Sequence, residues 1–147
     1  MSNRMRLANF LRALDEACIL DFDKHRFNHR LKIQKYIFIA QKLGFATKYN
    51  YSLYIHGPYS SNLADDYYRI NDFKNTEPVE LDSRFVRLVK NKSEEWLELA
   101  STILMIRGRY EGIDDERLVR LVTTVKPFAQ REQLIDIIRT LERCNVL

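Results

Sequence analysis

The sequence predicts a mainly α-helical fold with a small two-stranded β element, in a single compact domain that spans residues 1–147. The chain is 46% hydrophobic and 30% charged, a composition that buries a core and does not leave the chain disordered. It holds only four glycines and three prolines, too few for a turn-rich sandwich or barrel. Apolar residues recur at helical spacing through most of its length. A chain of 147 residues fits one domain.

The first two helices are predicted over residues 3–19 and 28–43. Asn28 is expected to cap the second helix, and Gly44 is expected to end it. This second helix is apolar over much of its circumference, so we expect it to be central to the fold. On the first helix the apolar side chains fall on one stripe, formed by Leu7, Leu11, Leu14 and Cys18.

A small β element is predicted after the second helix. Residues 49–55 are rich in Tyr, Ile and Leu and suit a short strand, which Gly57 and Pro58 interrupt. Residues 78–81 are the predicted second strand, pairing with 49–55. Between them a helix begins, capped by Ser60 or Ser61. The later helices are predicted from Asp82 or Ser83 through Val89, and over residues 93–107, 114–125 and 129–143.

The charges of the chain are unevenly distributed. Residues 1–50 carry ten Lys and Arg against four Asp and Glu, a net charge of +6, within a total of +4. No acidic residue lies between Asp23 and Asp65, an interval that also contains all three histidines. A one-signed stretch of this length suggests an anionic partner, although solvated helix faces account for it equally well.

Two motifs stand close together in this acid-free interval. The chain reads Leu31-Lys32-Ile33-Gln34-Lys35-Tyr36-Ile37-Phe38-Ile39-Ala40-Gln41-Lys42-Leu43, and then Tyr54-Ile55-His56-Gly57-Pro58-Tyr59-Ser60-Ser61-Asn62-Leu63. Both motifs resemble the YwgA-like proteins, which are related to the SocA (Panacea) antitoxin domain. Those proteins have a helix of the type Lys-Leu-Gln-Lys-Leu-Ile-Tyr-Leu-Ala-Gln, followed by a Gly-Pro-Tyr-Ser turn and another helix. A weaker likeness continues at residues 96–103 and 125–128.

The resemblance implies a small helical, winged-helix-like domain, and its relatives include antitoxins that neutralise a partner toxin by binding it. Our first hypothesis is therefore a non-enzymatic regulatory module that masks a protein partner by stoichiometric contact. Tyrosines at the turn suit an interface anchor, and a basic helix adds charge complementarity. The expected partner-binding residues are Lys32, Lys35, Tyr54, His56 and Tyr59. In the competing interpretation the turn is only a corner, Tyr59 packs in the core and Ser60 only caps a helix.

The second hypothesis is a nucleic-acid-binding regulator of winged-helix type that uses the acid-free basic segment 24–64. Cations interleaved with tyrosines suit the backbone and the bases of a nucleic acid. The residues expected to bind it are Lys24, Arg26, Arg30, Lys32, Lys35 and Lys42.

An enzyme with an unrecognised site is the third and weakest hypothesis. The chain has no Gly-x-Ser-x-Gly, no phosphate-binding glycine loop and no His-Glu-x-x-His, so we expect no catalytic residue and no cofactor. His25 and His29 have metal-ligand spacing, but neighbouring cations disfavour a metal. Cys18 and Cys144 are expected to be reduced and mostly buried. Without a signal-like or membrane-like apolar run, a soluble cytoplasmic protein is expected.

Gln34 and Gln41 lie seven residues apart, on one face of the second predicted helix. Three roles remain open for them. In the first role their amides hydrogen-bond the Gly-Pro-Tyr-Ser turn. In the second they bind a ligand, and in the third they hydrogen-bond only nearby backbone groups and solvent.

Overall fold

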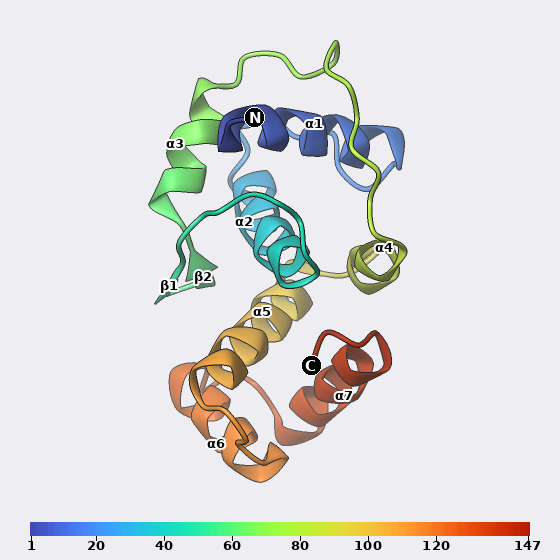
Figure 1. Cartoon of the computed structure of the whole chain (residues 1–147). Helices are drawn as coiled ribbons and strands as arrows, with labels where there is room; N and C mark the ends of the chain where they lie inside the picture. The colour runs from blue at the N-terminus through green and yellow to red at the C-terminus, as the bar shows by residue number, and fades with distance from the viewer.

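Two long helices, α2 (Phe27–Lys42) and α5 (Glu94–Arg109), pack against each other at the centre of the fold (Figure 1). The computed structural model describes all residues, 1–147. Helices α6 and α7 pack on α5 and on each other, while α3 and α4 contact α2. The remaining helices are α1 (Asn3–Glu16), α3 (Ser61–Arg69), α4 (Ser83–Val89), α6 (Asp115–Val125) and α7 (Arg131–Arg143). The mainly helical fold with a two-stranded element is thus confirmed, and it is compatible with a winged-helix-like arrangement.

Five of the seven helices begin with a side-chain cap, and the structure shows which of the predicted capping residues are used. Ser60 caps α3 by accepting a hydrogen bond from the N–H of Leu63, which satisfies a donor that the first turn leaves free. Helix α2 is different, because it begins at Phe27 after Arg26 with no side-chain cap, and Asn28 lies inside it. The capping side chains are Ser2, Ser60, Asp82, Ser93 and Asp114.

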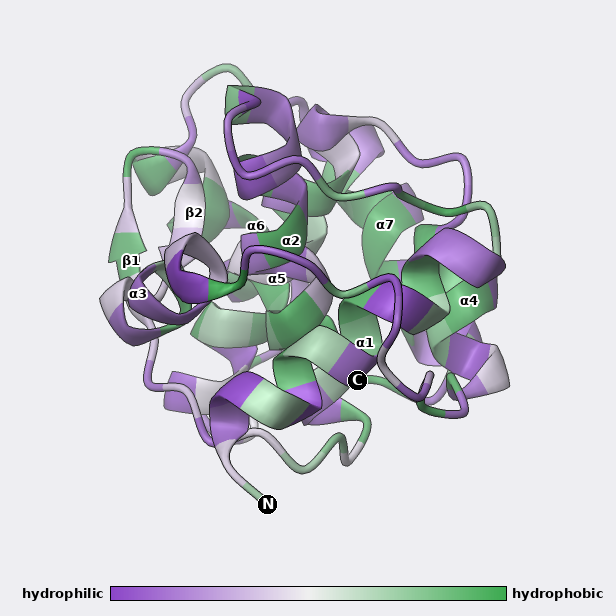
Figure 2. Cartoon of the chain, turned by 90° about the horizontal axis from the view of Figure 1, so that it is seen from above, coloured by the Kyte–Doolittle hydropathy of each residue, from purple (hydrophilic) through white to green (hydrophobic).

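One connected core of 35 buried residues joins all the helices. In α2 the eight consecutive residues 33–40 are buried, so this helix is enclosed on all sides over two turns. Figure 2 shows the hydrophobic residues of the helices turned mainly to the interior and the hydrophilic ones to the surface. The expected central position of the second helix is confirmed, and it places two polar side chains, Gln34 and Lys35, inside the core.

The β element is a tight hairpin. Strand β1 (Ser52–Tyr54) pairs antiparallel with β2 (Gly57–Tyr59), with Leu53 opposite Pro58. The predicted pairing of 49–55 with 78–81 is therefore wrong. The chain reverses already at Ile55-His56, because Gly57 adopts a φ of +91° that a glycine accepts at low cost. Pro58 lacks an N–H, but a strand of a two-stranded ribbon has one unpaired edge where proline is tolerated.

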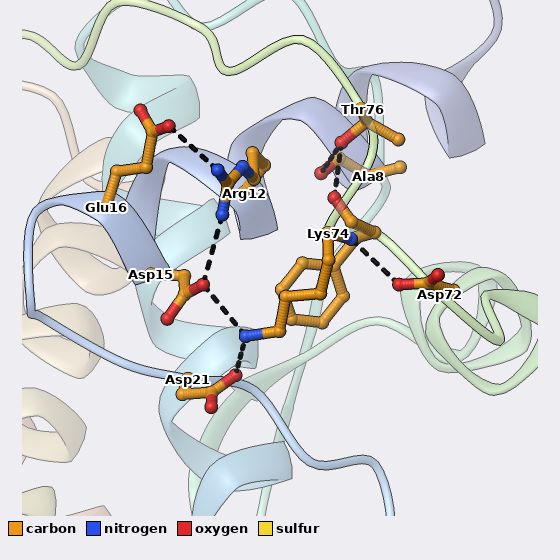
Figure 3. A network of polar contacts seen from close by, with 9 residues as sticks. Ala8, Arg12, Asp15, Glu16, Asp21, Asp72, Lys74 and Thr76 are labelled. Atoms are coloured by element: carbon orange, nitrogen blue, oxygen red, sulfur yellow. Dashed lines mark hydrogen bonds and ion pairs between the residues drawn. The ribbon is translucent and has the colours of Figure 1, made fainter.

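Residues 70–82 form an extended connection that is fastened to α1. The N–H of Val79 donates to the carbonyl oxygen of Asn9. Lys74 reaches Asp15 and Asp21 with its ammonium group, at 2.8 and 2.5 Å (Figure 3). These pairs are exposed, so they contribute little to stability and mainly position the connection.

The two cysteines lie at less buried positions than predicted. Helix α1 ends at Glu16, so Cys18 falls in the following turn, exposed and with φ +57°, and not on the apolar stripe. Cys144 is half-buried beyond the end of α7, and both thiols are free. No helix of the chain combines the length and hydropathy that a bilayer crossing requires.

Candidate partner-binding site

The turn of the hairpin is pressed against helix α5. A Cβ atom at Gly57 would lie 3.2 Å from Thr102 Oγ1 and 3.3 Å from Glu98 Cγ. Two features therefore favour glycine at this position: the positive φ and the close approach of the backbone to α5. The consequence is that Ile55 and His56, the two turn residues, are held at a fixed position beside α5.

Helix α2 fixes the chain on both sides of the hairpin through two glutamines. Gln34 Nε2 donates to the carbonyl oxygen of Ser60 at 2.9 Å, and the N–H of Ser60 donates to Gln34 Oε1 at 2.8 Å. Gln41 makes the same two-way contact with the backbone of Tyr49, at 3.2 and 2.9 Å. Of the open roles for these glutamines, hydrogen bonding to backbone, including the turn, is confirmed.

A buried lysine holds the second strand of the hairpin. Lys35 Nζ donates to the carbonyl oxygen of Pro58 at 3.0 Å, and the residue is only 2% exposed. Burial removes water from the ammonium group and lowers the pKa of Lys35 to about 8, although the carboxylate of Glu98 acts in the opposite direction. The expectation that Lys35 faces a partner is corrected, because its charged end supports the hairpin from within.

A second buried lysine, Lys126, fastens the tip of the hairpin. Its ammonium group donates to the carbonyl oxygen of Ile55 and lies 3.1 Å from Glu98 Oε2. The other carboxylate oxygen of Glu98 lies 3.5 Å from His56 Nδ1. Three parts of the chain that are distant in sequence thus meet under the turn, and the hairpin cannot shift without disturbing these contacts.

A cavity of about 410 Å³ opens beside this charged cluster. One wall comes from the N-terminal half of α2 and the other from the N-terminal half of α5, while the hairpin and the segment after α6 close it. Its residues combine apolar rings with both signs of charge. They are Phe27, Leu31, Lys32, Lys35, His56, Glu94, Glu95, Leu97, Glu98 and Phe128.

Exposed apolar side chains lie on the cavity wall, at Phe27 and Phe128, and at the adjacent hairpin tip. The rings of Phe27 and His56 meet edge to face with centroids 5.7 Å apart, and Ile55 at the tip is 85% exposed. Four of the nine exposed large hydrophobic residues of the chain belong to this surface. We call it the hairpin-tip patch, and it consists of Phe27, Tyr54, Ile55, His56 and Phe128. An exposed apolar group of this kind is typical of an interaction site.

The structure brings together three of the residues expected to bind a partner. Tyr54 and His56 are exposed in the patch, and Lys32 lies on the wall of the cavity. Tyr59 is half-buried and supports Tyr54, because their rings meet edge to face at 5.6 Å. Ser60 is buried and caps α3, so the competing interpretation of the turn as a structural corner applies to Ser60.

The residues expected to bind nucleic acid are more dispersed. Lys24 is engaged by the C-terminal end of α3, where it donates to the carbonyl oxygens of Tyr68 and Ile70. Arg30 lies near two aromatic rings, with its guanidinium carbon 5.7 Å from the centroid of Phe27 and 5.9 Å from that of Tyr68.

The remaining basic residues do not form one continuous face. Arg26 is exposed at the start of α2, whereas Lys42 is exposed near its end, over the ring of Phe38. The helix places Lys32 and Lys42 about 15 Å apart along its axis. With Lys35 buried, the free cations of the acid-free segment are too scattered for a single basic surface.

Sequence reasoning missed Ile55 and Phe128 in the patch and the two charges of Glu98 and Lys126 beneath it. They come from the turn, from α5 and from the end of α6, and only the fold unites them. The likeness at residues 125–128 is the one signal in the sequence that marks this second segment. No group of three or more His, Cys, Asp or Glu side chains is placed to hold a metal ion.

Comparison with known proteins gave no match to a family model, to a curated protein or to a solved structure.

Proposed function

We propose that this chain is a non-enzymatic, cytoplasmic binding module that covers part of a protein partner with its hairpin-tip patch. The observation that carries the proposal is the concentration of exposed apolar side chains at one place. Ile55 is 85% exposed, and Tyr54, Phe27 and Phe128 are each more than half exposed. Aromatic residues around a cavity are the usual anchors of protein interfaces.

The patch is also rigid, which favours tight binding because little order is lost when a partner docks. Two buried lysines and one buried glutamine hold the hairpin from below, at Pro58, Ile55 and Ser60. The backbone of the tip is therefore held in one arrangement.

The resemblance to YwgA-like and SocA (Panacea) proteins supports an antitoxin-like role. The motif residues Gln34, Lys35, Gly57 and Ser60 are those that build the platform under the patch. We infer that this chain belongs to the same family and that its partner is toxin-like, with the patch masking the partner's active surface.

The proposal is tested by capture from a lysate of the source cell with tagged chain, with and without nuclease treatment. Wild-type protein is compared with Ile55→Ser, which removes the most exposed apolar side chain of the patch. Tyr110→Ser is the matched control, since Tyr110 is 54% exposed and lies outside the patch. A stoichiometric protein that survives nuclease and is lost only with Ile55→Ser supports the proposal. Equal capture by all three proteins, or none, contradicts it.

Nucleic-acid binding is a second candidate, favoured by the grouping of the Arg30 cation with the aromatic rings of Phe27 and Tyr68. It predicts binding to single strands that weakens steeply with salt. Because Lys35 is buried, the appropriate charge reversal combines Arg26→Glu, Lys32→Glu and Lys42→Glu. Binding that is unchanged by this triple variant contradicts the second candidate.

A further inference from the structure

A second and larger cavity lies at the C-terminal end of α2, where Ala40 and Leu43 line it. Its volume is about 890 Å³, roughly twice that of the cavity beside the hairpin-tip patch. The walls are the N-terminal part of α1, the turn that follows α2, and the segment 79–85 that leads into α4 (Figure 1). The rise of a helix places Ala40 about 20 Å along α2 from Phe27, so the two cavities are separate sites. We call this one the α1–α4 cavity.

The floor of the α1–α4 cavity is aromatic. Phe10 of α1 and Phe85 of α4 are buried, and their rings meet edge to face with centroids 5.4 Å apart. Phe45, half-buried in the turn after α2, packs on Phe10 with the ring centroids 4.9 Å apart. All three residues line the cavity. A ligand with a flat aromatic ring continues this packing through further edge-to-face or offset contacts.

Hydrogen bonds from α1 hold the walls of the cavity in place. The N–H of Val79 donates to the carbonyl oxygen of Asn9 at 3.3 Å, which fixes the segment 79–85 on one side. On the other side Arg6 Nη1 donates to the carbonyl oxygen of Ala46 at 3.4 Å and fixes the turn after α2. The cavity is therefore already formed in the free chain, so a ligand loses little of its binding free energy to ordering the protein.

The charged side chains around the cavity cancel one another. They are two arginines and two acids: Arg6, Arg84, Glu80 and Asp82. Arg84 makes a two-bond pair with Asp82, from Nε to Oδ1 at 3.1 Å and from Nη2 to Oδ2 at 2.8 Å. Arg6 and Glu80 enter no ion pair of the chain and have opposite signs. A charged ligand would lose hydration and gain no net attraction, so an uncharged one fits best.

The cavity is accessible from solvent, because Gly44, Ala46 and Ser83 are exposed and line it. A Cβ atom added at Gly44 would have no other atom within 4 Å, which leaves the mouth open on that side. The Asn9 amide and the Ser83 hydroxyl supply hydrogen-bonding groups in an otherwise largely apolar lining. An apolar pocket of roughly 300–1,000 Å³ with a few polar groups is typical of small-molecule sites.

We propose that the α1–α4 cavity binds an uncharged, flat aromatic small molecule. Its rings pack against Phe10 and Phe45, and its polar edge faces the mouth of the cavity. This inference goes beyond the proposed function and does not rest on it, since the protein partner is assigned to the opposite end of α2.

Fluorescence titration of the purified full chain tests the site with two matched probes. Phenylnaphthylamine is an uncharged aromatic amine, and anilinonaphthalene sulfonate has the same ring system with one added negative charge. The uncharged probe is expected to bind at one saturable site, with a Kd about tenfold or more below that of the sulfonate.

Two substitutions locate the probe by filling the cavity from opposite walls. Ala46→Trp and Ser83→Trp are both at exposed positions, so neither replaces a core residue, and circular dichroism checks that each variant is folded. Each is expected to raise the Kd of the uncharged probe by about tenfold or more. Lys90→Trp, at an exposed position outside the cavity, is the matched control and is expected to leave the Kd unchanged. Ile55→Ser is also expected to leave it unchanged, which excludes adsorption of the probe on the hairpin-tip patch.

Four results overturn the proposal: no saturable binding, equal Kd values for the two probes, binding that survives both cavity-filling substitutions, or binding that is lost with Ile55→Ser. None of them affects the proposed function, because capture of a protein through Ile55 does not use the α1–α4 cavity.

Discussion

Lys126 donates a hydrogen bond from its ammonium group to the carbonyl oxygen of Ile55, which lies 71 residues earlier in the chain. The same ammonium lies 3.1 Å from Glu98 Oε2, and the lysine is 3% exposed. This contact joins the tip of the hairpin to the segment after α6 that supplies Phe128 to the patch. The hairpin-tip patch therefore exists as one surface because a buried charge unites its two halves.

Replacing Lys126 by methionine keeps the length of the side chain and removes its charge. Glu98 then loses its closest cation and the carbonyl oxygen of Ile55 loses its donor, so the free energy of unfolding is expected to fall by about 2–4 kcal/mol. Urea denaturation measures this loss. Lys90→Met, at an exposed lysine beyond α4, is the control and is expected to change stability by less than about 0.5 kcal/mol. Equal effects of the two substitutions would refute the structural role of Lys126.

Alanine substitutions at Gly57 and Gly44 distinguish two costs, the backbone strain of a positive φ and the steric contact of the new Cβ atom. Both residues have positive φ, +91° and +101°, so both alanine variants carry a backbone penalty of about 1 kcal/mol. At Gly44 no atom lies within 4 Å of the new Cβ, whereas at Gly57 it meets Thr102 and Glu98. Gly57→Ala is thus expected to destabilise the chain by at least about 1 kcal/mol more than Gly44→Ala in thermal or urea unfolding. Equal losses would mean that the hairpin does not approach α5 this closely.

Gln34 is fully buried and uses both ends of its amide on Ser60. Gln34→Glu keeps the shape but replaces the donor by an oxygen that faces the carbonyl of Ser60, inside the core. We expect a loss of about 3 kcal/mol or more at neutral pH, reduced in acid as the carboxyl group becomes protonated. Gln130→Glu, at the exposed N-cap position of α7 where the side chain makes no capping hydrogen bond, is the control. A loss for Gln34→Glu no greater than that of the control contradicts the buried pairing.

The lowered pKa of Lys35 predicts that the free energy of unfolding increases at alkaline pH. Its pKa is lowered to about 8 in the folded chain from a usual value of 10.5, so the unfolded chain binds more protons between these values. Unfolding then takes up a proton, and the free energy of unfolding increases as the pH rises from 8 towards 10.5. Burial raises the pKa of Tyr36 to about 12 and acts oppositely above pH 10, which limits the useful window to pH 8–10.

The measurement is urea unfolding of the wild type and of Lys35→Met at pH 8, 9 and 10. The difference in stability between the two proteins is expected to shift in favour of the wild type by about 1–2 kcal/mol across this range. A difference that is constant with pH would show that Lys35 is not desolvated in the folded state.

The sequence predicts the helices well and the β element poorly, for physical reasons. Helical periodicity and capping residues are local signals, and Ser60, Asp82 and Ser93 cap where the sequence places a cap. The hairpin depends on the φ of Gly57, which allows two interpretations of Gly57-Pro58: a strand end or a reversal into a second strand. The composition of the segment favours a strand end. The reversal into a second strand is favoured by the close contact of Gly57 with α5, and this contact is between residues distant in sequence.

The candidate site is only partly predictable for the same reason. Tyr54 and His56 were identified because they flank a recognisable turn. Lys32 and Lys35 belong to the same helix and motif, yet one reaches the wall of a cavity and the other is enclosed, a difference that depends on how α2 rotates against α5. Phe128 joins the patch only through the fold of the C-terminal helices.

Hydrogen exchange of the chain with and without its captured protein tests the central claim, that the hairpin-tip patch binds the partner, most directly. The account predicts that the backbone amides of residues 54–57 and of Tyr59, Lys126 and Phe128 exchange more slowly in the complex. Amides of α7, on another side of α5, are expected to be unchanged. Slower exchange confined to other surfaces, with the hairpin tip unaffected, would contradict the claim.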